Sequence, residues 1–518
     1  MKLDLLLKNI ADKSFDFVIT GEKNVAFKKI VDDTRKIEKG DLFVAIKGLH
    51  IDAHLLIPEA VKKGASIIVG EYIPKDVNKN VTRIEVSNSR RALALLASSY
   101  FNNPAQKMKV IGVTGTDGKT TTANLIYWFL LKKGLRVGLL STISAKIGNQ
   151  EYETGFHVTN PEPLLLYEFL AEMVENKAEY VVIEVTSHGL DQERVAGIKF
   201  DTGVLTNLTH EHLDYHKSME SYRKSKANLF KNVKYAVLNN DDKSSAFFEN
   251  ILNKETRLIS YGVKTKSDLM ADKINFEDKY MDFRLRYGTS ENIVKTTLLG
   301  AYNVHNILAA TAACLPYGVG VDDIANYLLD FPLLSGRLEK VNNDKGIDIY
   351  VDFAHTPNAL ENVLTLIKKQ TKGKLTAVIG CAGERDSNKR PLMGKISAER
   401  ADYTVFTAED PRSENVDDII DQMVVGANKA ASSELKSDNY HTTARGSKGY
   451  KLFLRIPERG EAISFAINKL AEPGDSVVIC GKGHEKSMNY RGVEYPWSDR
   501  EAAEMALAGS VKNISRVE

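Results

Sequence analysis

A glycine-rich stretch, Gly112-Val-Thr-Gly-Thr-Asp-Gly-Lys-Thr-Thr-Thr122, constrains the fold more than any other part of the sequence. The short apolar segment 109–113 before it predicts a buried strand, and the apolar segment 120–131 after it predicts a buried helix. A strand, a glycine turn and a helix in this order can bind phosphate, because backbone N–H groups and the helix N-terminus then face one point. We therefore predict a nucleotide site at this turn.

The loop residues have separate expected roles. Gly115 and Gly118 let the backbone bend. Lys119 is expected to reach the terminal phosphates, and the Thr120 hydroxyl to hold Mg²⁺. The spacing is not a full Walker A motif, because Val113 stands where its first glycine would be. A tight turn with a solvated lysine is the alternative, and the flanking strand and helix argue against it.

Length, net charge, cysteine content and the lengths of the apolar runs limit the class of protein. A chain of 518 residues is too long for one core, so we expect two to four domains. The net charge of +2 argues against nucleic-acid binding. Cys314, Cys381 and Cys480 form no zinc or disulfide pattern, which indicates a reducing compartment. Asp4 and Lys8 interrupt the N-terminal apolar run, and no run approaches the ~20 residues of a membrane span. We predict a cytoplasmic protein without a transmembrane segment.

Strands and helices alternate along the chain, which predicts α/β domains. In the first unit we expect strands at 41–46 and 65–70 and helices at 53–63 and 89–101. Residues 33–35, Asp-Thr-Arg, taken alone, are most simply a polar turn.

The second unit carries two groups of polar residues after predicted strands. Glu184 lies near the end of strand 180–185, so it should face the same sheet edge as Lys119 and is a Mg²⁺ candidate, although a capping role is possible. The stretch 210–216 holds three histidines and two carboxylates, which could suggest zinc; we favour a polar loop that serves the phosphates. Lys224 and Lys226, on a predicted helix at 222–230, read by composition as a solvated face.

The rest of the chain continues this pattern. Residues 257–299 predict an antiparallel addition, and Asn303 and Asn306 should share one helix face. In the third unit, strands end before the charged loops 383–386, 409–414 and 481–485, which should therefore line one rim. Asn358 is expected to cap a helix at 359–369, and residues 432–452 are expected to form a surface insertion.

These stretches together resemble the Mur ligases, ATP-dependent amide-forming enzymes of peptidoglycan precursor synthesis. The resemblance rests on the segments 115–121, 184–188, 206–214, 303–306, 336–339 and 352–357. Segments 41–45, 389–391, 410–412 and 481–485 are similar to the MurE type, which adds the third amino acid to UDP-N-acetylmuramoyl-L-alanyl-D-glutamate.

The resemblance implies an α/β fold of three domains. A UDP-substrate-binding domain would span 1–104, a central P-loop ATPase domain with a mostly parallel sheet 105–333, and a Rossmann-like domain that binds the amino acid 334–518. It also implies ATP and Mg²⁺ as cofactors, a UDP-N-acetylmuramoyl dipeptide and a diamino acid as substrates, and a monomer.

The resemblance further assigns roles to individual residues. Implied ATP-binding residues are Gly115, Thr116, Asp117, Gly118, Lys119, Thr120, Thr121, Asn303 for adenine, Arg337 for phosphate and Asp352 for ribose. Implied catalytic residues are Lys119, Glu184, His212, Lys226 and Arg337, and implied metal-site residues are Thr120, Glu184, His212 and Lys226 as a carbamate. Implied contacts to the UDP-substrate are Thr34, Arg35, Thr159, Asn160, Ser187 and Arg194. Implied contacts to the amino acid are Arg385, Asp410, Arg412, Gly481 and Glu485.

Some positions depart from the family pattern. Asp117 replaces an Asn, Glu211 replaces an Asp, and residues 382–386 alter Gly-Gly-Asp-Arg-Asp. Residues 409–412 read Glu-Asp-Pro-Arg where meso-diaminopimelate enzymes usually have Asp-Asn-Pro-Arg. Arg412 suits the second carboxylate of diaminopimelate, whereas the charge of Asp410 could favour lysine. We favour diaminopimelate and keep L-lysine as the alternative.

The implied mechanism passes through an acyl phosphate. The substrate carboxylate attacks the ATP γ-phosphate while Lys119, Arg337 and Mg²⁺ spread the developing charge, and the amino group then displaces phosphate. Closure of the C-terminal domain should keep water out. A folylpolyglutamate-synthetase-like ligase is the nearest rival, and a nucleotide switch is a rival of another class.

Overall fold

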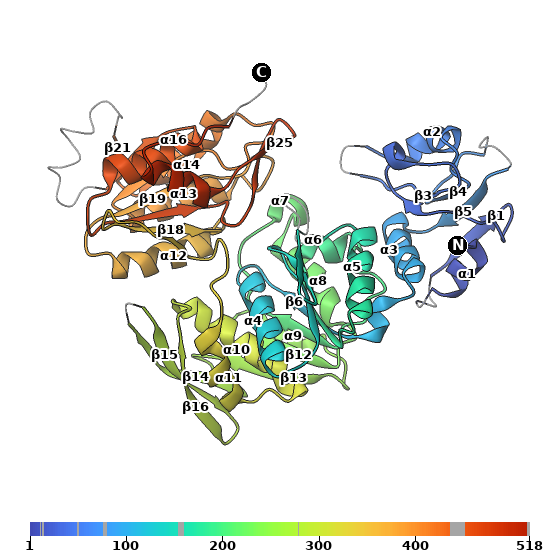
Figure 1. Cartoon of the computed structure of the whole chain (residues 1–518), viewed down its shortest axis with the longest axis horizontal. Coiled ribbons are helices and arrows are strands. Elements are labelled where there is room, and N and C mark those ends of the chain that lie inside the picture. Colours follow the sequence, from blue (N-terminus) through green and yellow to red (C-terminus); the bar gives the residue numbers. More distant parts are fainter. Residues whose placement is uncertain are drawn as a thin grey trace.

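The computed structural model describes residues 1–518 except for 11, 13–14, 49–50, 76–79, 154–159, 278, 436–450 and 515–518. Its helices and strands form three bodies that follow one another along the chain (Figure 1). The first body, in blue, and the third, in orange to red, lie on either side of the middle body (Figure 1). In the described part of the chain, no helix is long and apolar enough to cross a membrane.

The first body is a five-stranded sheet in the order β1-β5-β4-β3-β2. Its elements are α1 (Leu3–Lys8), β1 (Phe17–Thr20), β2 (Ile30–Val31), η1 (Thr34–Lys36), β3 (Leu42–Val44), η2 (Ala53–Leu56), α2 (Ile57–Lys62), β4 (Ile67–Gly70), β5 (Thr82–Val86), α3 (Ser89–Tyr100) and η3 (Pro104–Lys107). The single helix expected at 53–63 is wrong, since a 3₁₀ turn precedes α2. Pro58 lacks the N–H group that a continuous α-helix would need there.

The middle body is built on an eleven-stranded sheet in the order β16-β15-β14-β13-β12-β11-β6-β10-β7-β8-β9. Its first elements are β6 (Lys109–Thr114), α4 (Lys119–Lys132), β7 (Val137–Leu140), β8 (Ala145–Ile147), β9 (Gln150–Tyr152), α5 (Pro163–Glu175), β10 (Tyr180–Glu184), α6 (Ser187–Asp191), β11 (Thr202–Leu205), α7 (Leu213–His216), α8 (Met219–Ala227) and η4 (Asn228–Phe230). Its later elements are β12 (Tyr235–Asn239), α9 (Ser245–Asn250), β13 (Arg257–Gly262), β14 (Leu269–Phe276), β15 (Met281–Tyr287), β16 (Ser290–Thr296), α10 (Ala301–Cys314), η5 (Leu315–Tyr317), α11 (Val321–Tyr327) and η6 (Leu328–Asp330).

The centre of this sheet confirms the strand and helix predicted around the glycine loop. Strands β10, β6 and β11 are adjacent and parallel, so their carboxyl ends meet at one edge. Helices α4 and α10 cover one face, and α5 with η4 covers the other, each with a dense apolar cluster. The antiparallel addition expected at 257–299 is partly wrong: β13 pairs in parallel with β12 and β14, and β14–β16 are antiparallel.

The third body is a seven-stranded sheet in the order β17-β18-β23-β19-β20-β22-β21, with a separate hairpin β24–β25. Its elements are β17 (Glu339–Val341), β18 (Asp348–Asp352), α12 (Pro357–Gln370), β19 (Leu375–Ile379), α13 (Lys389–Arg400), β20 (Tyr403–Phe406), α14 (Val416–Lys429), β21 (Ser433–Glu434), β22 (Leu452–Arg455), α16 (Arg459–Phe465), η8 (Ala466–Leu470), β23 (Ser476–Cys480), β24 (Ser487–Tyr490), β25 (Val493–Pro496) and α17 (Asp499–Leu507). Helices α12–α14 cover one face and α16 with α17 the other. Most of the insertion expected at 432–452 lies outside the described residues.

One helix cap differs from its prediction. Thr356, not Asn358, caps α12, and its hydroxyl accepts a hydrogen bond from the backbone N–H of Ala359 at 3.1 Å. The Thr hydroxyl takes this role because Pro357 occupies the first helical position, which puts Asn358 inside the first turn. The Asn358 amide is thereby left to point away from the helix, toward the middle body.

Candidate functional site

The glycine loop between β6 and α4 wraps the edge of the middle sheet. Gly115 (φ 148°) and Gly118 (φ 80°) have backbone angles in the left-handed region. A Cβ at Gly115 would collide with the Thr206 hydroxyl, and one at Gly118 with the Asn306 amide. Both glycines are therefore required by the approach of neighbouring segments as well as by the turn itself.

The carboxylate of Glu184, at the end of β10, lies against the start of α4. It is 1% exposed and accepts hydrogen bonds from the Thr120 hydroxyl at 3.0 Å and the Thr142 backbone N–H at 3.0 Å. The Thr120 hydroxyl in turn accepts from the Arg337 guanidinium at 3.0 Å. The Lys119 ammonium donates to the Thr116 carbonyl at 2.7 Å. Oxygen donors and two cations thus converge at the first turn of α4.

Burial lowers the pKa of two nitrogen groups near the loop. Burial lowers the pKa of the His212 imidazole well below its ordinary value, and nearby His188 and Lys226 add to this. Burial, helped by the charge of Lys119, lowers the pKa of Lys226 well below its ordinary value. The Lys226 amine donates to the Gly115 carbonyl at 2.7 Å and lies 4.6 Å from the Tyr222 ring centroid.

The reading of Lys226 as a solvated surface residue is therefore wrong. Lys226 is 1% exposed, whereas Lys224 is exposed and pairs with Glu220 one turn earlier at 2.6 Å. Composition cannot separate the two lysines, because the helix α8 presents one to solvent and the other to the phosphate loop.

A cavity of about 890 Å³ lies between the middle and third bodies. Of the predicted residues, it is lined by Thr116, Asp117, Gly118, Lys119, Thr120, Thr121, Glu184, Arg194, His212, Asn303, Arg337, Asp352, Arg385, Asp410, Arg412, Gly481 and Glu485. The three charged loops of the third body share one rim, as predicted, and they face the glycine loop across this cavity.

Asp117 links the two walls of the cavity directly. Its carboxylate accepts a hydrogen bond from the Thr356 hydroxyl at 3.0 Å and one from the Asn358 amide at 2.8 Å, both at the start of α12. The N-terminus of a helix favours a negative charge, so α12 stabilises this carboxylate. The glycine loop of the middle body is thereby held against the third body.

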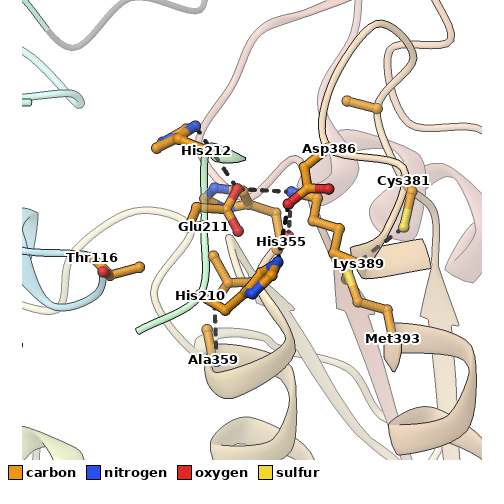
Figure 2. A network of polar contacts seen from close by, with 12 residues as sticks. Thr116, His210, Glu211, His212, His355, Ala359, Cys381, Asp386, Lys389 and Met393 are labelled. Carbon is orange, nitrogen blue, oxygen red and sulfur yellow. Dashed lines mark hydrogen bonds and ion pairs between the residues drawn. The ribbon is translucent and has the colours of Figure 1, made fainter. Parts of the chain in front are cut away.

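A buried ion pair forms a second link (Figure 2). The Lys389 ammonium donates to Glu211 at 3.1 Å and to the His355 carbonyl at 2.9 Å, and both side chains of the pair are 5% exposed. Burial alone would lower the pKa of Lys389, but the surrounding groups, Glu211 first among them and Glu409 as well, together outweigh this effect and raise it, so the lysine stays charged. His210 lies beside this pair and contacts Asp386 at 3.2 Å (Figure 2).

Two arginines of the third body face the cavity close to each other. Burial and the neighbouring Arg412 charge lower the pKa of Arg385. Asp410, in contrast, is ion-paired: the buried Lys482 ammonium lies 2.8 Å from both of its oxygens. Lys482 also pairs with Glu485. Both oxygens of Asp410 are therefore held by a lysine of the protein itself, whereas the two arginines line the same end of the cavity.

Lys482 was not among the predicted residues. The sequence does contain a signal for it: Asp410 and Glu485 belong to one predicted rim, and acidic residues require a counter-charge when they are buried.

The remaining predicted residues lie outside the cavity lining. Asn160 donates to the Glu184 carbonyl at 2.7 Å and accepts from the Thr186 backbone N–H at 2.8 Å, and its own carbonyl accepts from Arg194 at 2.7 Å. Ser187 is buried at the start of α6. The other described members of this group are Thr34 and Arg35 on η1 of the first body, Gly115 in the glycine loop, and Lys226 beneath that loop. Thr159 lies outside the described residues.

Comparison with known proteins gives consistent matches along the chain. The model of the Mur ligase middle domain matches residues 113–314, that of the Mur ligase glutamate ligase domain 336–483, and that of the Mur ligase family catalytic domain 27–101. The chain is 37% identical, over 97% of its length and 99% of the relative, to a UDP-N-acetylmuramoyl-L-alanyl-D-glutamate--2,6-diaminopimelate ligase from Clostridium botulinum. The chain belongs to the Mur ligase family.

A second relative of the same name, from Geobacillus kaustophilus, is 39% identical over 92% of this Mur ligase and 94% of the relative. A solved structure of a ligase with that name superposes with a TM-score of 0.62 at 26% identity, covering 93% of this chain and 95% of the other. The three-domain α/β fold expected from the sequence is thereby confirmed.

Proposed function

We propose that this Mur ligase joins meso-diaminopimelate to UDP-N-acetylmuramoyl-L-alanyl-D-glutamate with ATP, in peptidoglycan precursor synthesis. The proposal depends on one observation above all: a single cavity contains both the glycine loop and the arginine-bearing rim of the third body. The names of the relatives over nearly the full length support the same reaction. We further propose domains at 1–104, 105–333 and 334–518, and a monomeric protein that acts in the cytoplasm.

ATP would bind along the glycine loop. The Lys119 and Arg337 cations, which meet near Thr120, are suited to the transferred phosphate, because they oppose the charge that develops on its oxygens. Asn303 on α10 and Asp352 at the end of β18 line the same cavity and would hold adenine and ribose.

The donor set fits Mg²⁺ bound together with nucleotide phosphates. The Thr120 hydroxyl and the Glu184 carboxylate are hard oxygen donors within 3.0 Å of each other, and Mg²⁺ takes few protein ligands when phosphates supply the others. Among the described residues, no group of three or more His, Cys, Asp and Glu side chains is placed to hold a metal ion by itself. Bound Mg²⁺ would neutralise phosphate charge, with His212 close to the same loop.

We also propose that Lys226 is carbamylated. A neutral amine is the form that reacts with carbon dioxide, and burial beneath the loop shifts Lys226 toward that form by lowering its pKa. Addition joins the amine nitrogen to the carbon of carbon dioxide and releases one proton, which turns a nitrogen donor into a carboxylate suited to a hard metal.

The state of Asp410 favours diaminopimelate over L-lysine. Because both oxygens of Asp410 already accept from Lys482, that carboxylate is not available to a free ammonium of lysine. Arg412, with Arg385 nearby, remains to pair with the second carboxylate of diaminopimelate in bidentate fashion. Gly481 and Glu485 would contact the rest of the amino acid.

The UDP-substrate would reach the same cavity from the first body. Arg194 lines the cavity and is tied through Asn160 to the backbone of Glu184, so this group is placed to hold the dipeptide end near the phosphate loop. Thr34, Arg35, Thr159 and Ser187 would contact the remainder of the substrate.

The residues described above support two steps, formation of the acyl phosphate and attack of the amino group on it. Lys119 and Arg337 orient the γ-phosphate and stabilise its charge while a substrate carboxylate oxygen bonds to the γ-phosphorus, the bond from that phosphorus to the bridging oxygen breaks, and ADP leaves. The links of Asp117 to α12 and of Glu211 to Lys389 hold the two walls together, which excludes water from the acyl phosphate. The amino group held by the third body then attacks, and phosphate leaves.

Phosphate release tests this function. Release should require ATP, the UDP-dipeptide and diaminopimelate together, and the product should be the UDP-tripeptide. Release that needs a folate and glutamate instead would favour a folylpolyglutamate-synthetase-like ligase, and release with ATP alone would favour a nucleotide switch.

A further inference from the structure

Arg459 is a buried arginine that lies outside the cavity lining and outside every role assigned above. It begins α16 and is 1% exposed. Its guanidinium pairs in bidentate fashion with Asp499, with Nε at 2.7 Å from Oδ1 and Nη2 at 2.6 Å from Oδ2. The Trp497 indole N–H donates to the same Asp499 carboxylate at 2.9 Å, which fixes the acidic partner.

The other side of the guanidinium holds two backbone carbonyls. Nη1 donates to the Ala408 carbonyl at 3.0 Å, and Nη2 donates to the Cys480 carbonyl at 2.8 Å. Ala408 directly precedes the loop 409–412, and Cys480 directly precedes the loop 481–485. These are the two loops that would bind the amino acid.

No ladder hydrogen bond joins the two strands that carry these loops. In the sheet, β19 separates β20 from β23, so the spacing of the two loops depends on side-chain contacts. The ion pair of Lys482 with Asp410 joins the loops themselves, and Arg459 joins the strand ends from which they start. The backbone also needs support, because Asp410 (φ 42°) and Arg412 (φ 54°) are non-glycine residues in the left-handed region. A Cβ at Gly481 would collide with Glu409, so the loops lie in close contact.

We propose that Arg459 is a positioning residue that sets the spacing of the two amino-acid-binding loops. The inference rests on the proposed function, since it assigns an effect on diaminopimelate. Arg459 does not touch the amino acid. Its planar fork fixes both carbonyls at once, and a lysine, with a single ammonium, cannot reproduce this geometry. Binding sites of this kind require placement to within about 0.5 Å.

The test compares Michaelis constants in Arg459→Lys with those of the wild-type enzyme. We expect the KM for diaminopimelate to rise about tenfold or more, while the KM values for ATP and the UDP-dipeptide change by less than about twofold. The control is Ile463→Ala, a fully buried apolar position on the same helix whose side chain makes no hydrogen bond, with melting temperature measured for each protein. A merely structural role of Arg459 would make both variants behave alike.

A second variant covers the case in which Arg459→Lys does not fold. Asp499→Asn keeps the guanidinium but weakens its anchor, so the KM for diaminopimelate should rise selectively by a smaller factor. An unchanged KM for diaminopimelate in a folded variant, or an equal rise for all three substrates, would overturn the inference. Absence of ligation by the wild-type enzyme would instead overturn the proposed function, so the two failures are distinguishable.

Discussion

The Lys482 ammonium lies 2.8 Å from both carboxylate oxygens of Asp410, and the Lys482 side chain is fully buried. Burial alone would lower the pKa of Lys482, but Glu485 and Asp410 raise it above its ordinary value, so the lysine is charged. This ion pair occupies the carboxylate by which the sequence departs from its family at residue 410. The specificity of the site then depends on Arg412.

Arg412→Ala should selectively weaken the use of diaminopimelate. The variant would leave the second carboxylate of the amino acid without its bidentate partner, and we expect kcat/KM for diaminopimelate to fall on the order of 10²-fold. The rate with lysine, measured in the same coupled phosphate assay, should change by less than about threefold. An unchanged preference would refute the role of Arg412.

Asp410→Asn should keep the preference for diaminopimelate. The Asp410 carboxylate is already held by Lys482 and is not available to the substrate, and Lys482 retains Glu485 as a partner in the variant. We expect the ratio of kcat/KM for diaminopimelate and lysine to stay within about threefold, with a loss of about 1–3 kcal/mol in the free energy of unfolding. A sharp fall in activity with lysine alone would show that Asp410 does contact that substrate.

Breaking the ion pair between Glu211 and Lys389 should slow the reaction. Lys389→Met leaves Glu211 buried and unpaired, which costs about 3–5 kcal/mol and favours separation of the two bodies. We expect kcat to fall about 10²-fold, since misplacement of the reacting groups by about 1 Å has that effect. The double variant Glu211→Leu with Lys389→Met should recover part of this loss.

The matched control for that experiment is Lys395→Met on the same helix. Lys395 is half-exposed and pairs with Glu399 one turn later, so its loss should leave kcat within about twofold. Equal losses in both lysine variants would contradict a specific role for the interdomain pair.

Glu409 should make the stability of the protein depend on pH. Burial raises the pKa of its carboxyl from 4.5 to about 8. Between these values the folded state binds more protons than the unfolded state, so stability falls as pH rises from 4.5 to 8, and the loss is complete above pH 8. At pH 9, Glu409→Gln should raise the free energy of unfolding by on the order of 4 kcal/mol, because the variant has no carboxylate to bury. At pH 4 the Glu409 carboxyl is largely protonated in both states, so the substitution should change this pH-dependent contribution little. Urea unfolding at the two pH values would measure it, and equal effects at both would contradict the raised pKa.

Removal of carbon dioxide should inactivate the enzyme if Lys226 is carbamylated. Prolonged dialysis in carbon-dioxide-free buffer should lower activity, and added bicarbonate should restore it. With carbon-13 bicarbonate, a carbamate signal should appear in the NMR spectrum of the wild-type protein and be missing from Lys226→Arg. Full activity after dialysis, with no such signal, would show that Lys226 acts as an amine.

The sequence predicts the parts of this site that depend on local pattern. The glycine loop, Glu184 at the end of β10 and the three charged loops all follow from strands whose carboxyl ends share one edge. The buried state of Lys226 does not follow from composition, because it depends on which face of α8 meets the loop. The Asp117 link to α12 joins residues more than two hundred positions apart, and no local pattern specifies such a contact.

The cap of α12 shows how a local rule can also fail. Both Thr356 and Asn358 are good caps, and the choice between them depends on where Pro357 places the first turn. The Asn358 side-chain amide is then available to donate a hydrogen bond to Asp117 of the middle body, at 2.8 Å.

The most direct test offers diaminopimelate and L-lysine separately to the purified protein with ATP and the UDP-dipeptide, and identifies the product by mass spectrometry. We predict the UDP-tripeptide that contains diaminopimelate, formed with one phosphate per product and at a much higher kcat/KM than with lysine. A higher kcat/KM with lysine, or no tripeptide with either amino acid, would contradict the account.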